Sequence, residues 1–369
     1  MRETAGIRRY GYPVSATTRV TRDLERSRWT LRDERGPVQA QITTEPEPDG
    51  KAVRLTVDFE TNLLPFEARR YVLEPRPAGG PEEDASRPSG GMRVEEDESS
   101  FRLSNGGTLD WTIPKRSLKL LESVKTPETE FLRASGSGLK LRLKDGTLHE
   151  VSGPLSARIL KRGPIAASVR LEWSEEVSSG SPIRGAVDLE VPRAKSWVRA
   201  QISIQDPRRV VAGLEVALDL VVGNEPLLVD LGTPGGVYAN LQRGQAVRLA
   251  AKPDALKPWE ALKGEVGKLE PYVTARRGAG PAEGWAHFMD AKRCTALAIA
   301  DFAVRTSDRI EVDAAGGFRV SRTFLDDPSA PEATRDFTLW LHFVDTPPHV
   351  GAVTSPPSML FPPETRWGG

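Results

Sequence analysis

Short segments in which apolar and polar residues alternate recur along almost the whole chain, and they restrict the fold more than any other feature. In the stretch VRLTVDF, residues 53–59, every second residue is apolar. A period of two places those side chains on one face of a strand, so each such segment predicts a half-buried β-strand. Similar segments lie at residues 139–143, 167–173, 186–191, 198–204, 214–220, 247–250, 297–304, 317–324 and 337–344. Turn-forming residues separate several of them, so the sequence predicts an all-β sandwich or barrel.

Composition divides the chain into four parts. Residues 76–97 are rich in proline, glycine and acidic residues and are expected to form a linker. The linker would separate a small β-barrel-like domain at 1–75 from a large antiparallel β-supersandwich at 98–346. A proline-rich tail follows at 347–369, and it either straps the sandwich or begins another linker. One short helix is expected at 258–263, where Pro258 suits a first helical turn.

The charge balance and the single cysteine exclude several classes of protein. Fifty-one Lys and Arg residues match 51 Asp and Glu residues, so no overall basic field favours a nucleic acid or membrane partner. Cys294 is alone, which excludes an intramolecular disulfide and a cysteine-built zinc site. No run approaches the roughly 18 apolar residues that span a bilayer. The opening stretch also lacks the apolar core of a signal peptide, so the compartment is unknown and the cytoplasm is the default expectation.

Sequence motifs for metals and cofactors are absent. The glycine cluster at 232–236 has no following Lys-Ser or Lys-Thr and is interpreted as a turn between strands. The four histidines, His149, His287, His342 and His349, are scattered without metal-ligand spacing. We therefore expect no metal site and no cofactor, with a divalent cation such as calcium left open.

The stretch GWAHFMDAKRCTALAIADF, residues 284–302, reads as a hairpin with its turn at 290–293. On its first strand Trp285, His287 and Met289 share one face, and Ala286 lies on the other. One interpretation places Trp285 and His287 on an open sheet face with Arg293 at its rim. The other makes the tryptophan and the methionine packing residues, because such side chains on a sheet face are usually buried.

A second cluster of charged and aromatic residues lies at 318–343. Arg322 has the planar fork that holds a carboxylate through two hydrogen bonds, and Asp336, Trp340 and His342 follow on a predicted strand. The alternative is an ordinary solvated loop with salt-bridged arginines on its flanking strands. Tyr238, in the glycine-rich loop, is a candidate acid or base, although loop aromatic residues often only pack.

Several segments in order resemble the exo-type rhamnogalacturonan lyases. WTLRDERGPVQAQ with VRLTVDFETNLLPFEARRYVL looks like their first, barrel-like domain. SFRLSNGGTLDWTIPKRSLKLLESV and ILKRGPIAASVRLEW are similar to the opening strands of their central β-sandwich. GWAHFMDAKRCTALAIADF and FTLWLHF look like its closing strands. The resemblance touches most of residues 20–345.

This resemblance implies a galactose-mutarotase-like supersandwich and a uronate-containing polysaccharide as the partner. In those lyases a helical α/α toroid follows the sandwich, and nothing in residues 1–369 can form one. The sequence is then a fragment, or a separate toroid partner completes it, or the protein keeps carbohydrate contacts without the lyase chemistry.

Three functions stay open from the sequence. The first is binding of acidic polysaccharide with β-elimination, which needs groups that neutralise the uronate carboxylate, remove a proton and protonate the leaving oxygen. The second is a carbohydrate-binding or assembly subunit without catalysis. The third is a mutarotase-like or epimerase-like enzyme that pairs His287 or His342 with Asp336. The catalytic candidates are His287, Arg322, His342 and Tyr238, and the candidate carbohydrate contacts are Trp285, Arg293, Trp340 and Asp336.

Overall fold

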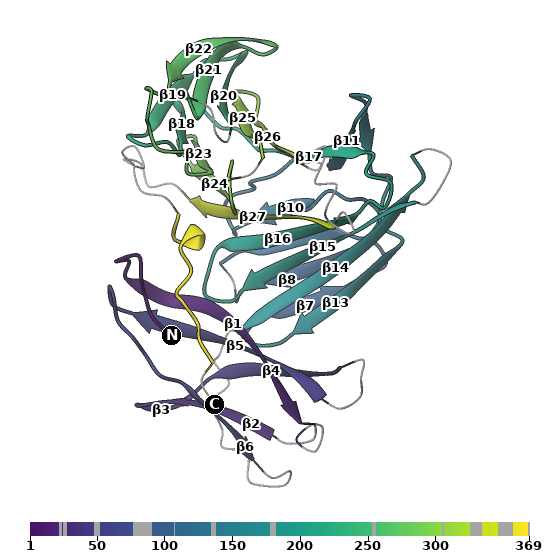
Figure 1. Ribbon diagram of the computed structural model, residues 1–369, viewed down its shortest axis with the longest axis vertical. Coiled ribbons are helices and arrows are strands. Elements are labelled where there is room, and N and C mark those ends of the chain that lie inside the picture. The colour runs from purple at the N-terminus through teal and green to yellow at the C-terminus, as the bar shows by residue number, and fades with distance from the viewer. Residues whose placement is uncertain are drawn as a thin grey trace.

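Antiparallel β-strands make up nearly all regular structure of this protein (Figure 1). The computed structural model describes residues 1–21, 24, 28–47, 52–76, 91–106, 108–133, 138–177, 182–252, 256–304, 306–324, 334–345 and 357–367. Most of the expected linker and the first half of the expected tail lie outside the described residues. Within them there is no α-helix, and hence no helix with the length and apolar character that a bilayer requires. The predicted all-β fold is confirmed.

The N-terminal part consists of two small sheets with strand orders β1-β5-β4 and β3-β2-β6. Leu55, Val57 and Phe59, predicted as one face of a strand, are buried together with Leu31 in the core of this part. The strands are β1 (Arg9–Thr21), β2 (Arg28–Asp33), β3 (Gly36–Val38), β4 (Ala40–Pro46), β5 (Ala52–Leu63) and β6 (Val72–Arg76).

The larger part is built from one nine-stranded, one eight-stranded and one four-stranded sheet. The nine-stranded sheet has the order β13-β14-β15-β16-β27-β24-β23-β18-β19. Its strands are β13 (Ser156–Arg162), β14 (Ala166–Glu175), β15 (Ile183–Pro192), β16 (Trp197–Gln205), β18 (Leu227–Leu231), β19 (Val237–Leu241), β23 (Trp285–Met289), β24 (Arg293–Ile299) and β27 (Thr334–Asp345).

The eight-stranded sheet has the order β12-β11-β17-β26-β25-β20-β21-β22, and the four-stranded sheet the order β10-β9-β8-β7. The strands of the first are β11 (Leu139–Leu143), β12 (Leu148–Glu150), β17 (Val211–Asp219), β20 (Gln245–Ala251), β21 (Trp259–Glu265), β22 (Lys268–Thr274), β25 (Asp308–Asp313) and β26 (Gly317–Thr323). Those of the second are β7 (Arg93–Glu96), β8 (Ser100–Ser104), β9 (Asp110–Pro114) and β10 (Ser123–Lys125). Residues 93–96, expected inside the linker, thus form a strand.

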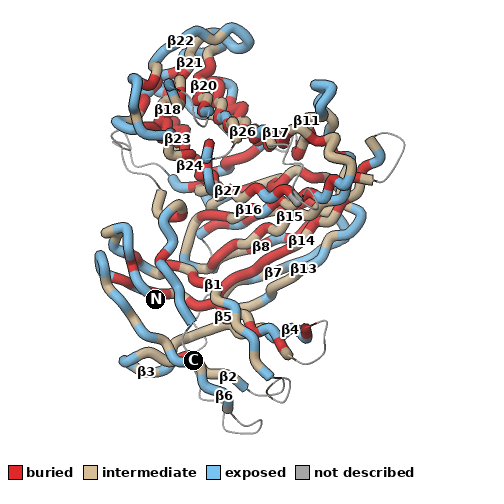
Figure 2. Tube along the Cα trace, in the orientation of Figure 1, coloured by how far each residue is buried: buried red, intermediate tan, exposed pale blue. Residues whose placement is uncertain are grey.

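One continuous core lies between the nine-stranded sheet and the other two (Figure 2). Each strand of the nine-stranded sheet contributes alternate apolar residues to it, such as Phe337, Leu339, Leu341 and Phe343 of β27. The intervening residues of that strand point to the outer face of the sheet. This alternation decides which side chains are available for a functional site on that face.

The helix expected at 258–263 is wrong, because these residues belong to strand β21. Trp259 and Ala261 are buried at a spacing of two, as a strand requires, and β21 pairs with β20 on one side and β22 on the other. Two flanking strands offer the backbone complete ladders of hydrogen bonds, which outweighs the local preference created by Pro258.

Ion pairs and a stretch of the tail join the N-terminal part to the outer face of the nine-stranded sheet. Arg193 donates two hydrogen bonds to Glu60, at 3.1 and 2.7 Å, and Lys161 binds Asp58 at 2.8 Å. The tail segment, residues 357–367, runs from the sandwich to the N-terminal part (Figure 1), and a short 3₁₀ helix, η2 (Ser358–Leu360), lies in it. The structure therefore places this stretch between the sandwich and the N-terminal part.

Arg9 holds the tail segment at its middle. Its guanidinium donates to the carbonyl oxygen of Ser358 at 2.9 Å and to that of Phe361, and it binds the Glu3 carboxylate at 3.0 Å. Further along, Glu364 exchanges two backbone hydrogen bonds with Arg2, both at 2.9 Å. The tail segment is thus fixed to the N-terminal part by hydrogen bonds.

Candidate functional site

Both predicted histidines lie in one row across the outer face of the nine-stranded sheet. Residues that pair directly in antiparallel strands point to the same face. The strand register gives the row Asp230, His287, Ala296, His342 and Trp197, in that order. The sequence prediction that Trp285, His287 and Met289 share a face agrees with this arrangement, because Ala286 and Phe288 belong to the core.

Most of the row is buried, and His342 is half-buried, although the row lies on the outer face of the sheet. His287 is 7% exposed, and its ring centroid lies 5.0 Å from that of Trp285. Its Nδ1 atom has no hydrogen-bond partner among the described residues, whereas Nε2 of His342 lies 2.7 Å from the Ser196 hydroxyl. Met359 of the tail segment is buried in one cluster with Trp197 and residues of the N-terminal part. The N-terminal part and the tail segment therefore cover one end of the row.

Burial keeps the two histidines neutral. It lowers the pKa of His287 to about 4, and the nearby charge of His342 adds to this effect. Burial likewise lowers the pKa of His342 to about 4, with a contribution from Lys195. Neither imidazole is a cation at neutral pH, so neither can neutralise a uronate carboxylate there.

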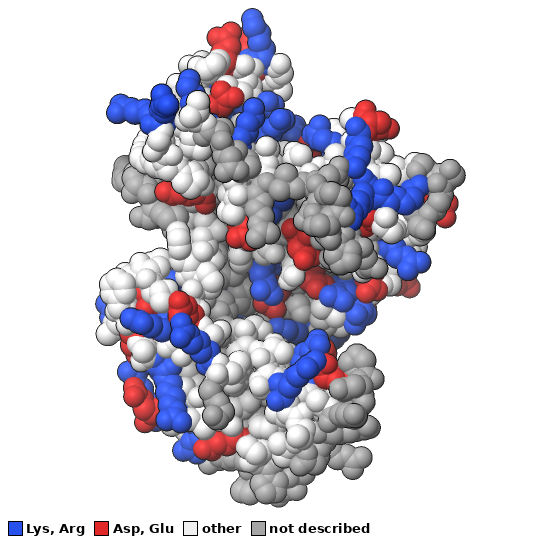
Figure 3. Space-filling model, viewed as in Figure 1, with Lys and Arg blue, Asp and Glu red and all other residues white. Residues whose placement is uncertain are grey.

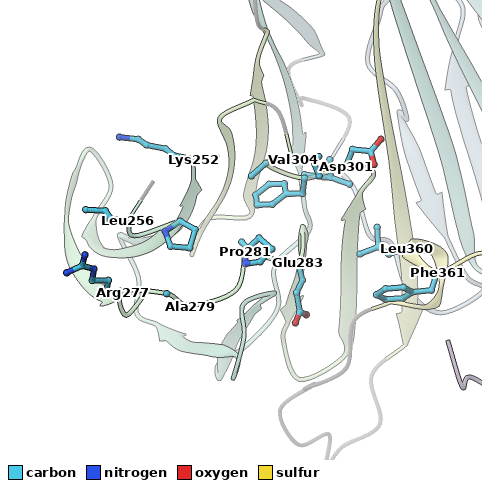
Figure 4. Close-up of a pocket in the computed structure, with 16 residues that line it drawn as sticks. Lys252, Leu256, Arg277, Ala279, Pro281, Glu283, Asp301, Val304, Leu360 and Phe361 are labelled. Carbon is cyan, nitrogen blue, oxygen red and sulfur yellow. The ribbon is translucent and has the colours of Figure 1, made fainter. Parts of the chain in front are cut away.

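Trp285 connects the row to a large cavity. Its Nε1–H donates to Oε2 of Glu283 at 2.8 Å, and Glu283 lines a cavity of about 840 Å³. In Figure 4, Lys252, Leu256 and Arg277 lie together on one side of this cavity, and Asp301, Leu360 and Phe361 lie on the other. The lining comes from Lys252, Leu256 and Pro258, from the loop 276–283, from the turn 299–304 that follows β24, and from the tail segment.

The large cavity combines free cations, carboxylates and exposed apolar surface. Neither Lys252 nor Arg277 makes an ion pair with any residue that the structure describes. Glu283 and Asp301 are its carboxylates. Three of its apolar side chains are exposed to an unusual degree, since Phe361 is 41%, Val304 63% and Leu256 72% exposed. Such a lining suits a ligand with a carboxylate, hydroxyl groups and an apolar face.

Arg322 does hold a carboxylate, but it is one from its own sheet. Its Nε and Nη2 donate to Asp308 at 2.9 and 2.8 Å, and both side chains are buried. Asp336 is exposed and lines, with Arg322 and Arg335, a second cavity of about 440 Å³. Along β27 Asp336 is six residues from His342, which corresponds to about 20 Å. The structure does not bring Asp336 near the histidines.

The other predicted residues are spread over the same sheet. Arg293 closes the hairpin turn by binding Asp290 at 2.9 Å and the carbonyl oxygen of Glu130 at 2.8 Å. Trp340 is half-buried and packs beside the cluster that contains Met359. Tyr238 is 40% exposed on β19, at the sheet edge.

Cys294 lies half-buried on β24. Burial raises the pKa of the Cys294 thiol to about 12, and the charge of Asp230 adds to this rise, so the thiol is protonated at neutral pH. Among the described residues no group of three or more His, Cys, Asp or Glu side chains is arranged to hold a metal ion.

The sequence did not single out the residues of the large cavity. Glu283 is the one cavity residue that the sequence could have indicated, because it lies two positions before Trp285 and directly precedes the predicted hairpin. Lys252 and Arg277 lie in loops without periodicity, and Phe361 lies in the proline-rich tail. Only the chain path brings these loops together.

Charges of both signs are intermixed on the face shown in Figure 3. This distribution follows the equal numbers of acidic and basic residues in the chain.

Comparison with known proteins supports the fold alone. No family model and no curated protein matches the chain. An α-mannosidase from Enterococcus faecalis V583 is similar in structure, with 11% identity, a TM-score of 0.52, and coverage of 94% of this chain and 43% of the mannosidase. A glycosyl hydrolase family 38 protein from Enterococcus faecalis gives 10% identity, a TM-score of 0.54, and coverage of 94% and 44%. The chain thus spans less than half the length of either protein.

A galactose mutarotase-like protein from Lactobacillus casei also matches, at 10% identity over 69% of this chain and 100% of its own. Its TM-score is 0.35, which is too low to add to the argument. The comparisons are consistent with the predicted β-sandwich and give no support for the rhamnogalacturonan lyase family in particular.

Proposed function

We propose that this protein binds saccharides that carry a carboxylate, and that they bind in the large cavity. The observation that carries this proposal is the pair of cations, Lys252 and Arg277, on one side of a cavity whose opposite side presents Phe361. An ammonium and a guanidinium that form no ion pair with the described residues are suited to charge-assisted hydrogen bonds with a uronate carboxylate.

The remaining lining suits the rest of a sugar. The exposed ring of Phe361 can cover the apolar face of a pyranose, and Glu283 and Asp301 can accept hydrogen bonds from its hydroxyl groups. The volume of about 840 Å³ lies in the range of small-molecule sites and is large enough for more than one sugar ring. The structural neighbours named above, an α-mannosidase and a glycosyl hydrolase, favour a sugar-related role.

The residues predicted as catalytic lie outside the large cavity, so the proposal is one of binding. Elimination from a uronate needs a proton acceptor and a proton donor at the sugar. No histidine or tyrosine is among the described residues that line the large cavity, where Glu283, Asp301 and Lys252 are the groups able to accept or donate a proton. The resemblance to rhamnogalacturonan lyases makes rhamnogalacturonan the first polymer to test, and the absorbance of an unsaturated uronate would reveal cleavage.

The double variant Lys252→Ala/Arg277→Ala is expected to weaken binding of a galacturonide oligosaccharide about a hundredfold or more. Each charge-assisted hydrogen bond contributes about 1.5–3 kcal/mol, and about 1.4 kcal/mol corresponds to a tenfold change in Kd. Isothermal titration calorimetry with galacturonides and with neutral galactosides of the same length measures the difference.

Lys268→Ala/Arg309→Ala is the matched control, because it removes the same charge from exposed positions outside the cavity. Equal affinity for charged and neutral sugars, or an equal loss in both double variants, would refute the proposed site. Saturable binding without ultraviolet product would support a binding protein. Product formation would restore the lyase hypothesis.

A further inference from the structure

The turn that follows β24 has an unusual backbone. It supplies Asp301, Phe302, Ala303 and Val304 to the wall of the large cavity. Asp301 and Ala303 have φ angles of 50° and 52°, in the left-handed region that non-glycine residues rarely adopt. Two such residues in one turn persist only where the surroundings fix the backbone firmly.

Arg322 and Asp308 provide that fixation. Nη2 of Arg322 donates to the carbonyl oxygens of Ala300 and Asp301 at 2.9 and 3.0 Å, while the same guanidinium binds Asp308. Oδ2 of Asp308 in turn accepts from the backbone N–H of Ala303 at 2.7 Å. The pair therefore binds the backbone of the turn at three residues, Ala300, Asp301 and Ala303.

The pair is itself held rigidly. Arg322 of β26 and Asp308 of β25 face each other in the strand register, and they are 9% and 0% exposed. The guanidinium also lies over the ring of Phe337, with its Cζ atom 4.9 Å from the ring centroid. The hydrogen bonds and the ring contact together leave this side chain little freedom to move.

We infer that Arg322 and Asp308 are positioning residues for saccharide binding, which hold the turn 300–304 in the shape that the large cavity requires. Neither residue lines that cavity, so both act through the backbone of the turn. The inference rests on the proposed function for its ligand. It gives Arg322, predicted from the sequence as a carboxylate-binding catalytic residue, a different role at the same site.

Arg322→Lys separates positioning from general stability. Lysine keeps the positive charge opposite Asp308 but lacks the planar fork that reaches the carboxylate and two carbonyl oxygens at once. Amide hydrogen exchange in residues 300–304, measured without ligand, is expected to accelerate at least about tenfold as this local opening becomes easier. Affinity for the galacturonide is expected to fall about tenfold.

Arg193→Lys is the matched control, since Arg193 makes a similar double hydrogen bond to Glu60 far from the turn. It should change neither the exchange at 300–304 nor the affinity. Unchanged exchange in Arg322→Lys, or an equal loss of affinity in Arg193→Lys, overturns the inference. If Arg322→Lys does not fold, Asp308→Asn is compared with Arg193→Lys in the same way. The asparagine amide oxygen can still accept the hydrogen bond from Ala303, but the negative charge that orients Arg322 is lost.

The two proposals fail in different ways. A wild-type protein that binds no galacturonide refutes the proposed function and, with it, the positioning role in binding. The exchange measurement, which uses no ligand, then still decides whether the pair fixes the turn. Galacturonide binding that depends on Lys252 and Arg277, but not on Arg322, refutes the positioning role alone.

Discussion

Glu3→Ala is expected to lower the free energy of unfolding by about 3 kcal/mol. The carboxylate of Glu3 is fully buried and binds Arg9 at 3.0 Å, and it accepts backbone hydrogen bonds from Ala5, Gly6 and Phe66. Its removal leaves several buried donors without an acceptor, together with a guanidinium that is 1% exposed. Breaking a buried ion pair on one side typically costs about 3–5 kcal/mol.

Chemical denaturation measures this loss, and Glu67→Ala is its control. Glu67 forms a comparable pair with Arg69, but its side chain is 23% exposed, so a loss of about 1 kcal/mol is expected there. Because Arg9 also holds the tail segment, Glu3→Ala should in addition weaken saccharide binding through displacement of Phe361. Equal losses in both variants would show that burial of the Glu3–Arg9 pair has no special importance.

The pKa of Glu3 gives the same variant a signature at low pH. Burial would raise this pKa, but the hydrogen bonds from Arg9 and from backbone N–H groups outweigh burial and lower it to about 2. The stabilisation is therefore complete above pH 4.5, the ordinary pKa of a glutamate, and is lost as the pH falls from there through about 2. In Glu3→Ala this part of the pH dependence should be missing.

Local patterns were sufficient to predict most of the strands. The hairpin at 284–302 follows from alternation on β23 and from a turn that Asp290 and Arg293 close by binding each other. The short helix at 258–263 failed because the ladders to β20 and β22 come from strands that a local pattern does not include. Strand pairing, a long-range effect, decided the structure there.

The candidate site depends on how segments that are distant in the sequence pack together, and a local sequence pattern does not predict this packing. The sequence singled out His287 and His342 as separate candidates, but the row that contains both is covered at one end by Met359 and the N-terminal part. Arg322 was expected to hold a carboxylate. Its partner is Asp308, which lies directly opposite it on the adjacent strand β25. A pairing of that kind cannot be distinguished from a ligand contact without the strand register.

Acidification from pH 7 to pH 5 is expected to destabilise the protein through His287 and His342. Burial lowers the pKa of each to about 4, below the ordinary value of 6.5, so the unfolded chain binds protons first as the pH falls. The stability that depends on these neutral histidines is fully present above about pH 6.5 and is lost as the pH falls from there to about 4. Each histidine should contribute a slope of about 1.4 kcal/mol per pH unit within this window.

Denaturation curves at pH 7, 6 and 5 measure the slope, and His287→Phe/His342→Gln should flatten it. Phenylalanine preserves a ring beside Trp285 and removes the unpartnered Nδ1 atom, while glutamine keeps a hydrogen-bonding group opposite Ser196. His149→Gln, on β12 and outside the row, is the control and should leave the slope in place. A slope that survives the double variant would mean that groups other than this buried row set the response to acid. A flattened slope would show that the burial of His287 and His342 sets this part of the response to acid.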